Sequence, residues 1–151
     1  MKEVHVECKP DELLVSKLGI PRKSITHHFG KSRVFNTLSK KGNQLAIVDE
    51  DPGGPRHPYE NSLRFIEKTE GIKYYSDNSN NKVFVLSVKL EDWIVWICNK
   101  QKIKLSVFNL QDNPNKLHSE INSKLKDFGS LIDELLKQKN PGILKLKAWL
   151  K

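Results

Sequence analysis

The 151-residue chain is predicted to fold as a single α/β domain, with helices flanking a mostly parallel sheet. Strand and helix patterns alternate through its first half, an order typical of parallel strands joined by right-handed crossovers. In addition, Leu45–Val48 is a continuous apolar run of strand length, which is typical of a strand covered on both faces. A chain of this length can bury one such sheet beneath a few helices.

The first half is expected to contain five elements: a strand over 4–7, a helix from Pro10 to Gly19, a strand over 24–29, a helix from Gly30 to Gly42, and the strand Leu45–Val48. Proline and acidic side chains favour a first helical turn, because that turn needs no N–H from proline and its dipole attracts carboxylates. Glycine favours helix ends because it adopts positive φ at little cost. The third strand is followed at 49–55 by a loop rich in aspartate, proline and glycine.

The second half is less regular. We expect a helix over 58–69 with Leu63 and Ile66 facing inward, strands over 72–75 and 83–88, and a helix over 90–100. The segment 102–110 fits either a helix or a strand. Apolar residues spaced by three and four predict one amphipathic helix from Lys116 to Lys139, weakened at Gly129, before a short helix that begins at Pro141. Residues 1–110 would form the core, and 111–151 a basic helical extension packed on the same domain.

The composition limits the classes of partner. Twenty-six basic against 18 acidic residues leave a net charge of +8, which favours an anionic partner such as nucleic acid. Eleven lysines against five acidic residues lie between Lys100 and Lys151, so this segment either contacts phosphates or is simply a solvated helix face. There is no apolar run of the ~20 residues that span a bilayer and no secretory signal, so we expect no membrane partner. Two cysteines build no disulfide framework, and we expect a cytoplasmic protein.

Acidic residues follow two of the predicted strands. Glu7 ends the first strand and Asp49 ends the third, and Asp51 projects to the same side as Asp49 if the chain stays extended. Ligands of open α/β sheets bind outside the carboxyl ends of the strands. Carboxylates that meet there repel one another unless a cation such as Mg²⁺ or Mn²⁺ neutralises them. The alternative is that Asp-x-Asp-Pro-Gly-Gly is an ordinary turn sequence.

Four segments, in this order, resemble Toprim domains, which occur in topoisomerases, primases and overcoming-lysogenization-defect nucleases. Residues 6–11 (Val-Glu-Cys-Lys-Pro-Asp) resemble the family's opening strand followed by Glu-Gly-x-x-Asp, and residues 48–51 (Val-Asp-Glu-Asp) resemble its Asp-x-Asp strand end. Residues 30–32 (Gly-Lys-Ser) resemble the short turn before the second helix of many small members. Residues 88–93 (Val-Lys-Leu-Glu-Asp-Trp) are similar to the strand–Glu–x–Trp step of the small defence-associated branch. The resemblance covers roughly residues 1–110.

The resemblance implies a Toprim, Rossmann-like fold and a Mg²⁺-dependent nuclease for DNA or RNA, in phage defence or a toxin-like system. Glu7 would be a general acid/base or a metal ligand, and Asp49 and Asp51 would hold Mg²⁺ or Mn²⁺. Glu91 would complete a second metal position, although acidic residues also commonly open a helix. Cys8 stands where the family usually has glycine. This departure favours the alternative, a non-catalytic nucleic-acid-binding or assembly subunit that works with an ATPase partner.

The candidates for nucleic-acid contact are four basic side chains: Lys9, Lys31, Arg33 and Arg56. The alternative for each is a solvated surface position. Residues 30–32 do not complete a phosphate-binding P-loop, because Ile25 stands where that motif needs glycine. Trp93 and Trp96, three residues apart, either stack on bases or belong to the core.

Overall fold

The computed structural model describes residues 2–151, and it confirms the α/β fold class. Six strands form one sheet in the order β2-β1-β3-β6-β5-β4, of which the first four are mutually parallel. The antiparallel hairpin of β4 and β5 extends the sheet beyond β6. The strands are β1 (Val4–Val6), β2 (Ile25–His27), β3 (Leu45–Asp49), β4 (Arg64–Thr69), β5 (Ile72–Ser76) and β6 (Lys82–Leu86).

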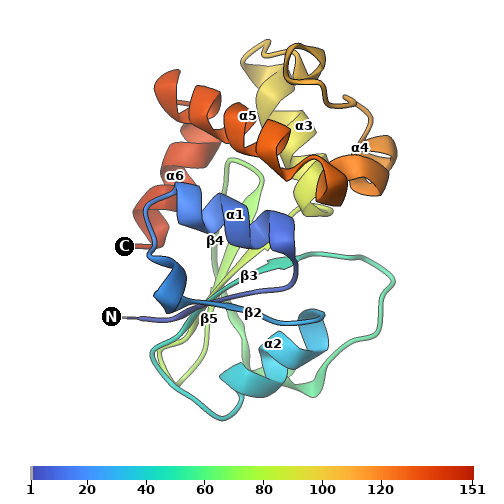
Figure 1. Cartoon of the computed structure of the whole chain (residues 1–151). Helices are drawn as coiled ribbons and strands as arrows, with labels where there is room; N and C mark the ends of the chain where they lie inside the picture. The colour runs from blue at the N-terminus through green and yellow to red at the C-terminus, as the bar shows by residue number, and fades with distance from the viewer. Residues whose placement is uncertain (1) are drawn as a thin grey trace.

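Helices cover both faces of this sheet (Figure 1). One face carries α1, α3, α5 and α6, and the other carries α2 together with a 3-10 turn over Pro58–Ser62. The helices of the described residues are α1 (Lys9–Lys17), α2 (Lys31–Leu38), α3 (Leu90–Lys100), α4 (Pro114–Glu120), α5 (Leu125–Lys137) and α6 (Pro141–Trp149). Within residues 2–151, no helix is both long and apolar enough to cross a membrane.

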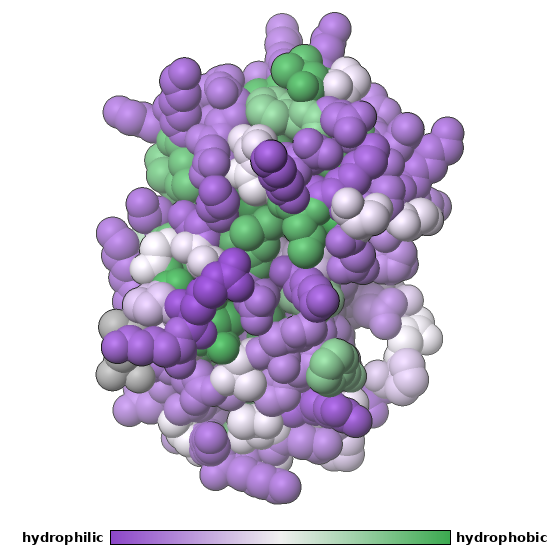
Figure 2. Space-filling model, in the orientation of Figure 1, coloured by the Kyte–Doolittle hydropathy of each residue, from purple (hydrophilic) through white to green (hydrophobic). Residues whose placement is uncertain are grey.

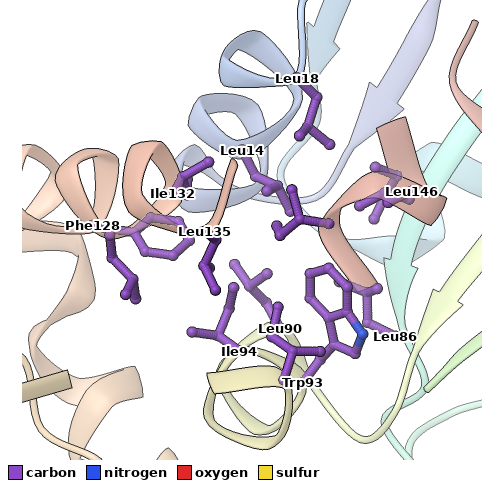
Figure 3. Packing of buried hydrophobic residues seen from close by; sticks show 14 of the residues in the cluster. Leu14, Leu18, Leu86, Leu90, Trp93, Ile94, Phe128, Ile132, Leu135 and Leu146 are labelled. Atoms are coloured by element: carbon purple, nitrogen blue, oxygen red, sulfur yellow. The ribbon is translucent and has the colours of Figure 1, made fainter. Parts of the chain in front are cut away.

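The strand β3 is buried on both sides, as its continuous apolar run predicts. Leu45 and Ile47 face the larger core, whereas Ala46 and Val48 face α2. In the larger core, side chains of α1, α3, α5 and α6 point toward a common interior (Figure 3). The outer surface is by contrast mostly hydrophilic, and apolar side chains show only in small separate groups on the face in Figure 2.

The helix predicted over 58–69 is wrong. A 3-10 turn occupies only Pro58–Ser62, the strand β4 follows, and the side chain of Ile66 is 49% exposed instead of facing inward. Glu70 and Gly71 both have positive φ, 54° and 75°, and they form a two-residue hairpin connection of the kind that matches strand twist. Pairing with β5 through this turn decides the conformation, because residues 64–69 bury too little surface to stabilise a helix.

The single helix predicted from Lys116 to Lys139 is also wrong. It is divided into α4 and α5 by a 3-10 turn over Ile121–Ser123, whereas Gly129 lies inside α5 without interrupting it. Leu117 and Phe128, on the two sides of the break, are both fully buried. The change of direction therefore allows both apolar faces to reach one core. The ambiguous segment 102–110 contains a 3-10 turn, Leu105–Phe108, and α2 ends at Leu38 before the predicted Gly42.

Asn81 provides a test of the packing between α2 and the sheet. Its fully buried side-chain amide donates to the carbonyls of Leu38 and Lys41 at 3.0 and 2.8 Å. Its Oδ1 accepts from the backbone N–H of Gln44 at 2.8 Å. We expect Asn81→Ala to lower the free energy of unfolding by about 3 kcal/mol, because buried polar groups lose their partners. Urea denaturation measures this loss. The exposed Asn78→Ala is the matched control, and an equal effect in both variants would contradict the argument.

Candidate active site at the carboxyl edge of the sheet

The candidate site lies where the strand order reverses. From β1 the chain passes through α1 to β2 on one side, and β3 then pairs on the other side of β1 after α2 has crossed the opposite face. The carboxyl ends of β1 and β3 therefore lie side by side at the edge of the sheet where α1 and α2 begin, at the right of Figure 1. In open α/β sheets, ligands usually bind outside the strand ends at such a reversal, in the crevice between the two connections.

Glu7 and Asp49, the two acids predicted at matching strand ends, are brought into direct contact. The backbone N–H of Asp49 donates to Glu7 Oε2 at 2.6 Å. The backbone N–H of Leu90 donates to Asp49 Oδ1 at 2.8 Å, so the carboxylate of Asp49 lies at the positive end of α3. Each carboxylate retains a second oxygen for other contacts.

Asp11 joins this pair, and sequence reasoning did not include it among the site residues. It lies in the first turn of α1 and is only 1% exposed. Its Oδ2 accepts a hydrogen bond from Cys8 Sγ at 3.0 Å, while its Oδ1 is buried with no hydrogen-bond partner among residues 2–151. A buried, unpartnered carboxylate oxygen is costly, so it indicates an incomplete polar site. The signal was available in the spacing Glu7-x-x-x-Asp11, but an acid in a first helical turn has an ordinary explanation.

The buried carboxylates raise one another's pKa. Burial, followed by the charges of Glu7 and Glu91, raises the pKa of Asp49 from 3.8 to about 7. Burial and the charge of Asp49 hold the pKa of Asp11 well above its usual range. Burial also raises the pKa of Glu7, although the Asp49 N–H and the Lys31 ammonium partly oppose it. A cluster with these properties is stabilised when it takes up protons or a cation.

Asp51 and Glu91, the other predicted ligands, lie at the margin of this cluster. The expected extended geometry at Asp51 is wrong, because its φ is 46° and the exposed residue turns away from the strand with its N–H bonded to Val88 O at 3.0 Å. Its charge nevertheless helps to raise the pKa of Glu7. Glu91 is 4% exposed, and its Oε1 lies 2.5 Å from His118 Nδ1 on α4, a partner that the sequence did not reveal.

One of the four predicted basic residues, Lys31, interacts with the carboxylates, and a second, Arg56, shares a pocket with it. Lys31 donates to the backbone oxygen of Glu50 at 3.0 Å, and its charge lowers the pKa of both Glu7 and Asp49. Lys31 and Arg56 line one pocket of about 290 Å³ at the start of α2.

The other two are not in that pocket. Arg33 lies over the exposed ring of Phe29, 6.0 Å from its centroid. Lys9 lines a separate hollow beside Glu12 and Arg22. Of the four, only Lys31 and Arg56 share a pocket.

Cys8 occupies the position of the family's glycine without backbone strain. Its φ of −148° is extended and open to any residue. Burial, together with the neighbouring Asp11 carboxylate, raises the pKa of the thiol, so it remains protonated and donates to Asp11. The protonated thiol is therefore part of the acidic cluster and a weaker nucleophile than a thiolate.

The adjacent residues His27 and His28, at the end of β2, contact different neighbours. His28 Nε2 contacts Nδ1 of the buried His5 at 2.9 Å, whereas the His27 ring packs on Phe29 with centroids 5.1 Å apart. Burial lowers the pKa of His28. The described structure gives no shared metal position to this pair.

A divalent cation fits the chemistry of the carboxylate cluster. Its donors are hard oxygens of the kind that Mg²⁺ and Mn²⁺ prefer, and Asp11 Oδ1 is an orphaned buried acceptor among them. Within residues 2–151, no three histidine, cysteine, aspartate or glutamate side chains are already arranged to hold a metal ion. The cluster therefore fits a divalent cation in its type of donor atom and in its unsatisfied negative charge.

No protein-family model, curated protein or solved structure matches this chain. The chemistry of the site is consequently inferred from its own residues. These are three mutually repelling carboxylates at the edge of the sheet, with one basic side chain, Lys31, that interacts with two of them.

The raised pKa values predict how stability depends on pH in the absence of divalent ions. A carboxyl group whose pKa is higher in the folded than in the unfolded state makes the protein less stable as pH rises. The free energy of unfolding should therefore fall between about pH 4 and pH 7. Asp49→Asn should recover up to about 4 kcal/mol at pH 8, since a pKa raised from 3.8 to about 7 corresponds to that free energy at about 1.4 kcal/mol per pKa unit. Urea denaturation in EDTA across this range measures the change.

The matched control is Asp133→Asn, an exposed carboxylate that pairs with Lys17 at 2.9 Å. Because surface ion pairs contribute little, it should alter the pH profile by less than about 1 kcal/mol. A profile for Asp49→Asn that equals the profile of the parent protein would show that the charge of Asp49 costs the fold nothing.

Proposed function

We propose that this protein is a Mg²⁺-dependent, Toprim-type nuclease that hydrolyses phosphodiester bonds of DNA or RNA. The observation that carries the proposal is the convergence of Glu7, Asp11 and Asp49 at the carboxyl ends of β1 and β3, with Asp11 Oδ1 buried and unpartnered among the described residues. The resemblance of residues 1–110 to Toprim domains supports it, as does the net charge of +8. Phage defence or a toxin-like system is the proposed setting.

Asp11 and Asp49 would hold Mg²⁺ or Mn²⁺, with Asp51 and Glu91 as further ligands, and Glu7 would be either a further ligand or the general acid/base. The ion would supply a Lewis acid that polarises the phosphodiester and lowers the pKa of water. No covalent nucleophile is needed from the protein, because phosphoryl transfer depends mainly on positioning and charge stabilisation.

The chain's own residues would bind the substrate and move the proton. Burial raises the pKa of Glu7 above its usual range, so the carboxyl group can hold a proton nearer to neutral pH and act as a general acid/base. Lys31 and Arg56, which line one pocket, would bind the phosphate oxygens. The lysine-rich segment from Lys100 to Lys151 would follow the backbone of the nucleic acid.

A non-catalytic nucleic-acid-binding or assembly subunit, working with an ATPase partner, is the second candidate. The observation that favours it is the Cys8–Asp11 hydrogen bond, because the thiol occupies one oxygen of a proposed ligand where the family has glycine. We expect either form to act in a reducing cytoplasm, where both free cysteines stay thiols.

The nuclease proposal predicts metal-dependent cleavage. Labelled single- and double-stranded DNA and RNA, including tRNA, should be cut with Mg²⁺ or Mn²⁺ and remain intact in EDTA. Asp11→Asn, Asp49→Asn and Glu7→Gln should each lower the rate by at least about 100-fold, because each removes a metal ligand or the acid/base group. Gel electrophoresis of the products measures the rates.

Asp133→Asn is the matched control, and it should cleave at the rate of the parent protein. Cleavage that persists in Glu7→Gln and Asp49→Asn would exclude this site as the active centre. Salt-sensitive binding without cleavage in any lane would support the assembly subunit instead.

Metal binding should also be visible without any substrate. A cation bound only by the folded state raises the melting temperature, by about 4 °C at ten times its Kd for a chain of this size. We expect this shift with MgCl₂ in the parent protein and in Asp133→Asn, and its loss in Asp11→Asn. Thermal denaturation at matched ionic strength in NaCl separates binding from screening. Equal shifts in MgCl₂ and NaCl would contradict a specific site.

A further inference from the structure

A second pocket, of about 560 Å³, adjoins the candidate site at the same edge of the sheet. It lies between the turn that joins β4 to β5, the segment Ser87–Val88 after β6, and the first half of α3. Its volume is in the range of small-ligand sites. The proposed nuclease chemistry uses none of the side chains that line it.

Trp96 forms the aromatic side of this pocket and is 43% exposed, whereas Trp93 on the same helix is fully buried in the core. Trp93 therefore belongs to the core, which is one of the two roles expected from the sequence. Trp96 remains available for the other, stacking on a base. A Cβ at Gly71 would lie only 3.1 Å from the Trp96 ring, so the ring packs directly on that backbone. Lys100 Nζ lies 4.4 Å from the ring centroid and also bonds Glu70 at 3.2 Å. Trp96 is thus held in place while much of its surface stays open.

The polar groups of the pocket suit a ligand that both donates and accepts hydrogen bonds. Ser87 Oγ is buried with no hydrogen-bond partner among residues 2–151, although a hydroxyl can donate and accept. Asp92 supplies acceptors and Lys68 supplies a cation at the rim. A nucleobase has an aromatic face for Trp96 and an edge of donors and acceptors for Asp92 and Lys68.

Backbone hydrogen bonds connect the wall of the pocket to the carboxylate site. Asp49 pairs with Leu86 in the register of β3 and β6, and Glu50 N donates to Leu86 O at 3.0 Å. Asp51 N then donates to Val88 O at 3.0 Å, which ties the acidic loop to the wall of the pocket. A phosphate held at the carboxylates and a base held in this pocket would therefore contact the two sides of one loop.

We infer that the Trp96 pocket binds one unpaired nucleobase of a nucleic-acid strand whose phosphate lies at the Glu7–Asp11–Asp49 cluster. This inference rests on the proposed function for the position of the phosphate. A base in a duplex has its faces stacked and its edge paired, so only a base that is single-stranded, looped out or flipped can enter. The substrate class is accordingly single-stranded nucleic acid, or a duplex that contains an unpaired base.

The test measures binding with the Asp49→Asn protein, so that cleavage does not consume the probe. Short single-stranded DNA and RNA oligonucleotides and the corresponding blunt duplexes are titrated at fixed salt, followed by tryptophan fluorescence and by anisotropy of a labelled end. We expect single strands to quench the fluorescence and to bind at least tenfold tighter than duplexes. Adding Trp96→Ala should weaken single-strand binding by about 5- to 100-fold, the loss expected for one base–aromatic stack, and abolish the quenching. Trp96→Phe should retain most of the affinity.

Phe65→Ala is the matched control, since this ring is 58% exposed and packs on Tyr75 at the far end of the hairpin from the turn. It should bind single strands as the parent does. Equal affinity with and without Trp96, or duplexes bound as tightly as single strands, would overturn the inference. An equal loss in Phe65→Ala would overturn it too, because the loss would then not depend on the pocket.

The two proposals fail separately. If the parent protein cuts nucleic acid but Trp96→Ala cuts single strands equally well, the base pocket is wrong and the nuclease stands. If the parent protein cuts nothing but Trp96 still governs single-strand binding, the base pocket stands on a protein that only binds.

Discussion

The candidate site depends on the burial of carboxylates that repel one another. Glu7, Asp11, Asp49 and Glu91 come from four places along the chain. The charges of Glu7 and Glu91 act on both Asp49 and Asp11, and the charge of Asp49 also acts on Asp11. Burial weakens the solvation of each charge, and proximity to like charges adds to the cost. A fold that maintains such an arrangement loses stability at neutral pH unless protons or a cation offset it. The arrangement does not stabilise the fold, and we therefore interpret it as a candidate functional site.

The apolar scaffold explains how the protein tolerates this cost. The core beneath α1, α3, α5 and α6 is continuous from the strands to the last helix, so the starts of α1 and α3 are held by packing and not by the carboxylates themselves (Figure 3). Backbone N–H groups then compensate part of the charge, as Leu90 does for Asp49 and Asp49 does for Glu7. Donors fixed in this way require no reorganisation when charge changes at the site.

Two pockets with different surfaces adjoin the acidic loop, and the proposed nucleic-acid ligand would use both. On one side of the acids, Lys31 and Arg56 share a basic pocket, and on the other, Trp96 presents an aromatic face beside Ser87 and Asp92. The acidic loop connects the two sides, because Lys31 bonds Glu50 O and Val88 O bonds Asp51 N. A phosphate and its neighbouring base could thus contact the protein on either side of a single loop.

Local patterns alone were sufficient for the parallel half of the fold. The apolar run Leu45–Val48, the alternating first strand and the helix-opening Pro10 each act over a few residues, so their order predicted the sheet and the meeting of Glu7 with Asp49 at its edge. Tertiary structure decided the rest, because it depends on contacts between distant residues. It paired 64–69 as a strand, divided the helix near Ile121, turned Asp51 out of line, and gave Glu91 the partner His118. It also left Asp11 Oδ1 buried and unpartnered among the described residues, and it separated Trp93 from Trp96, because burial depends on which elements pack around a residue.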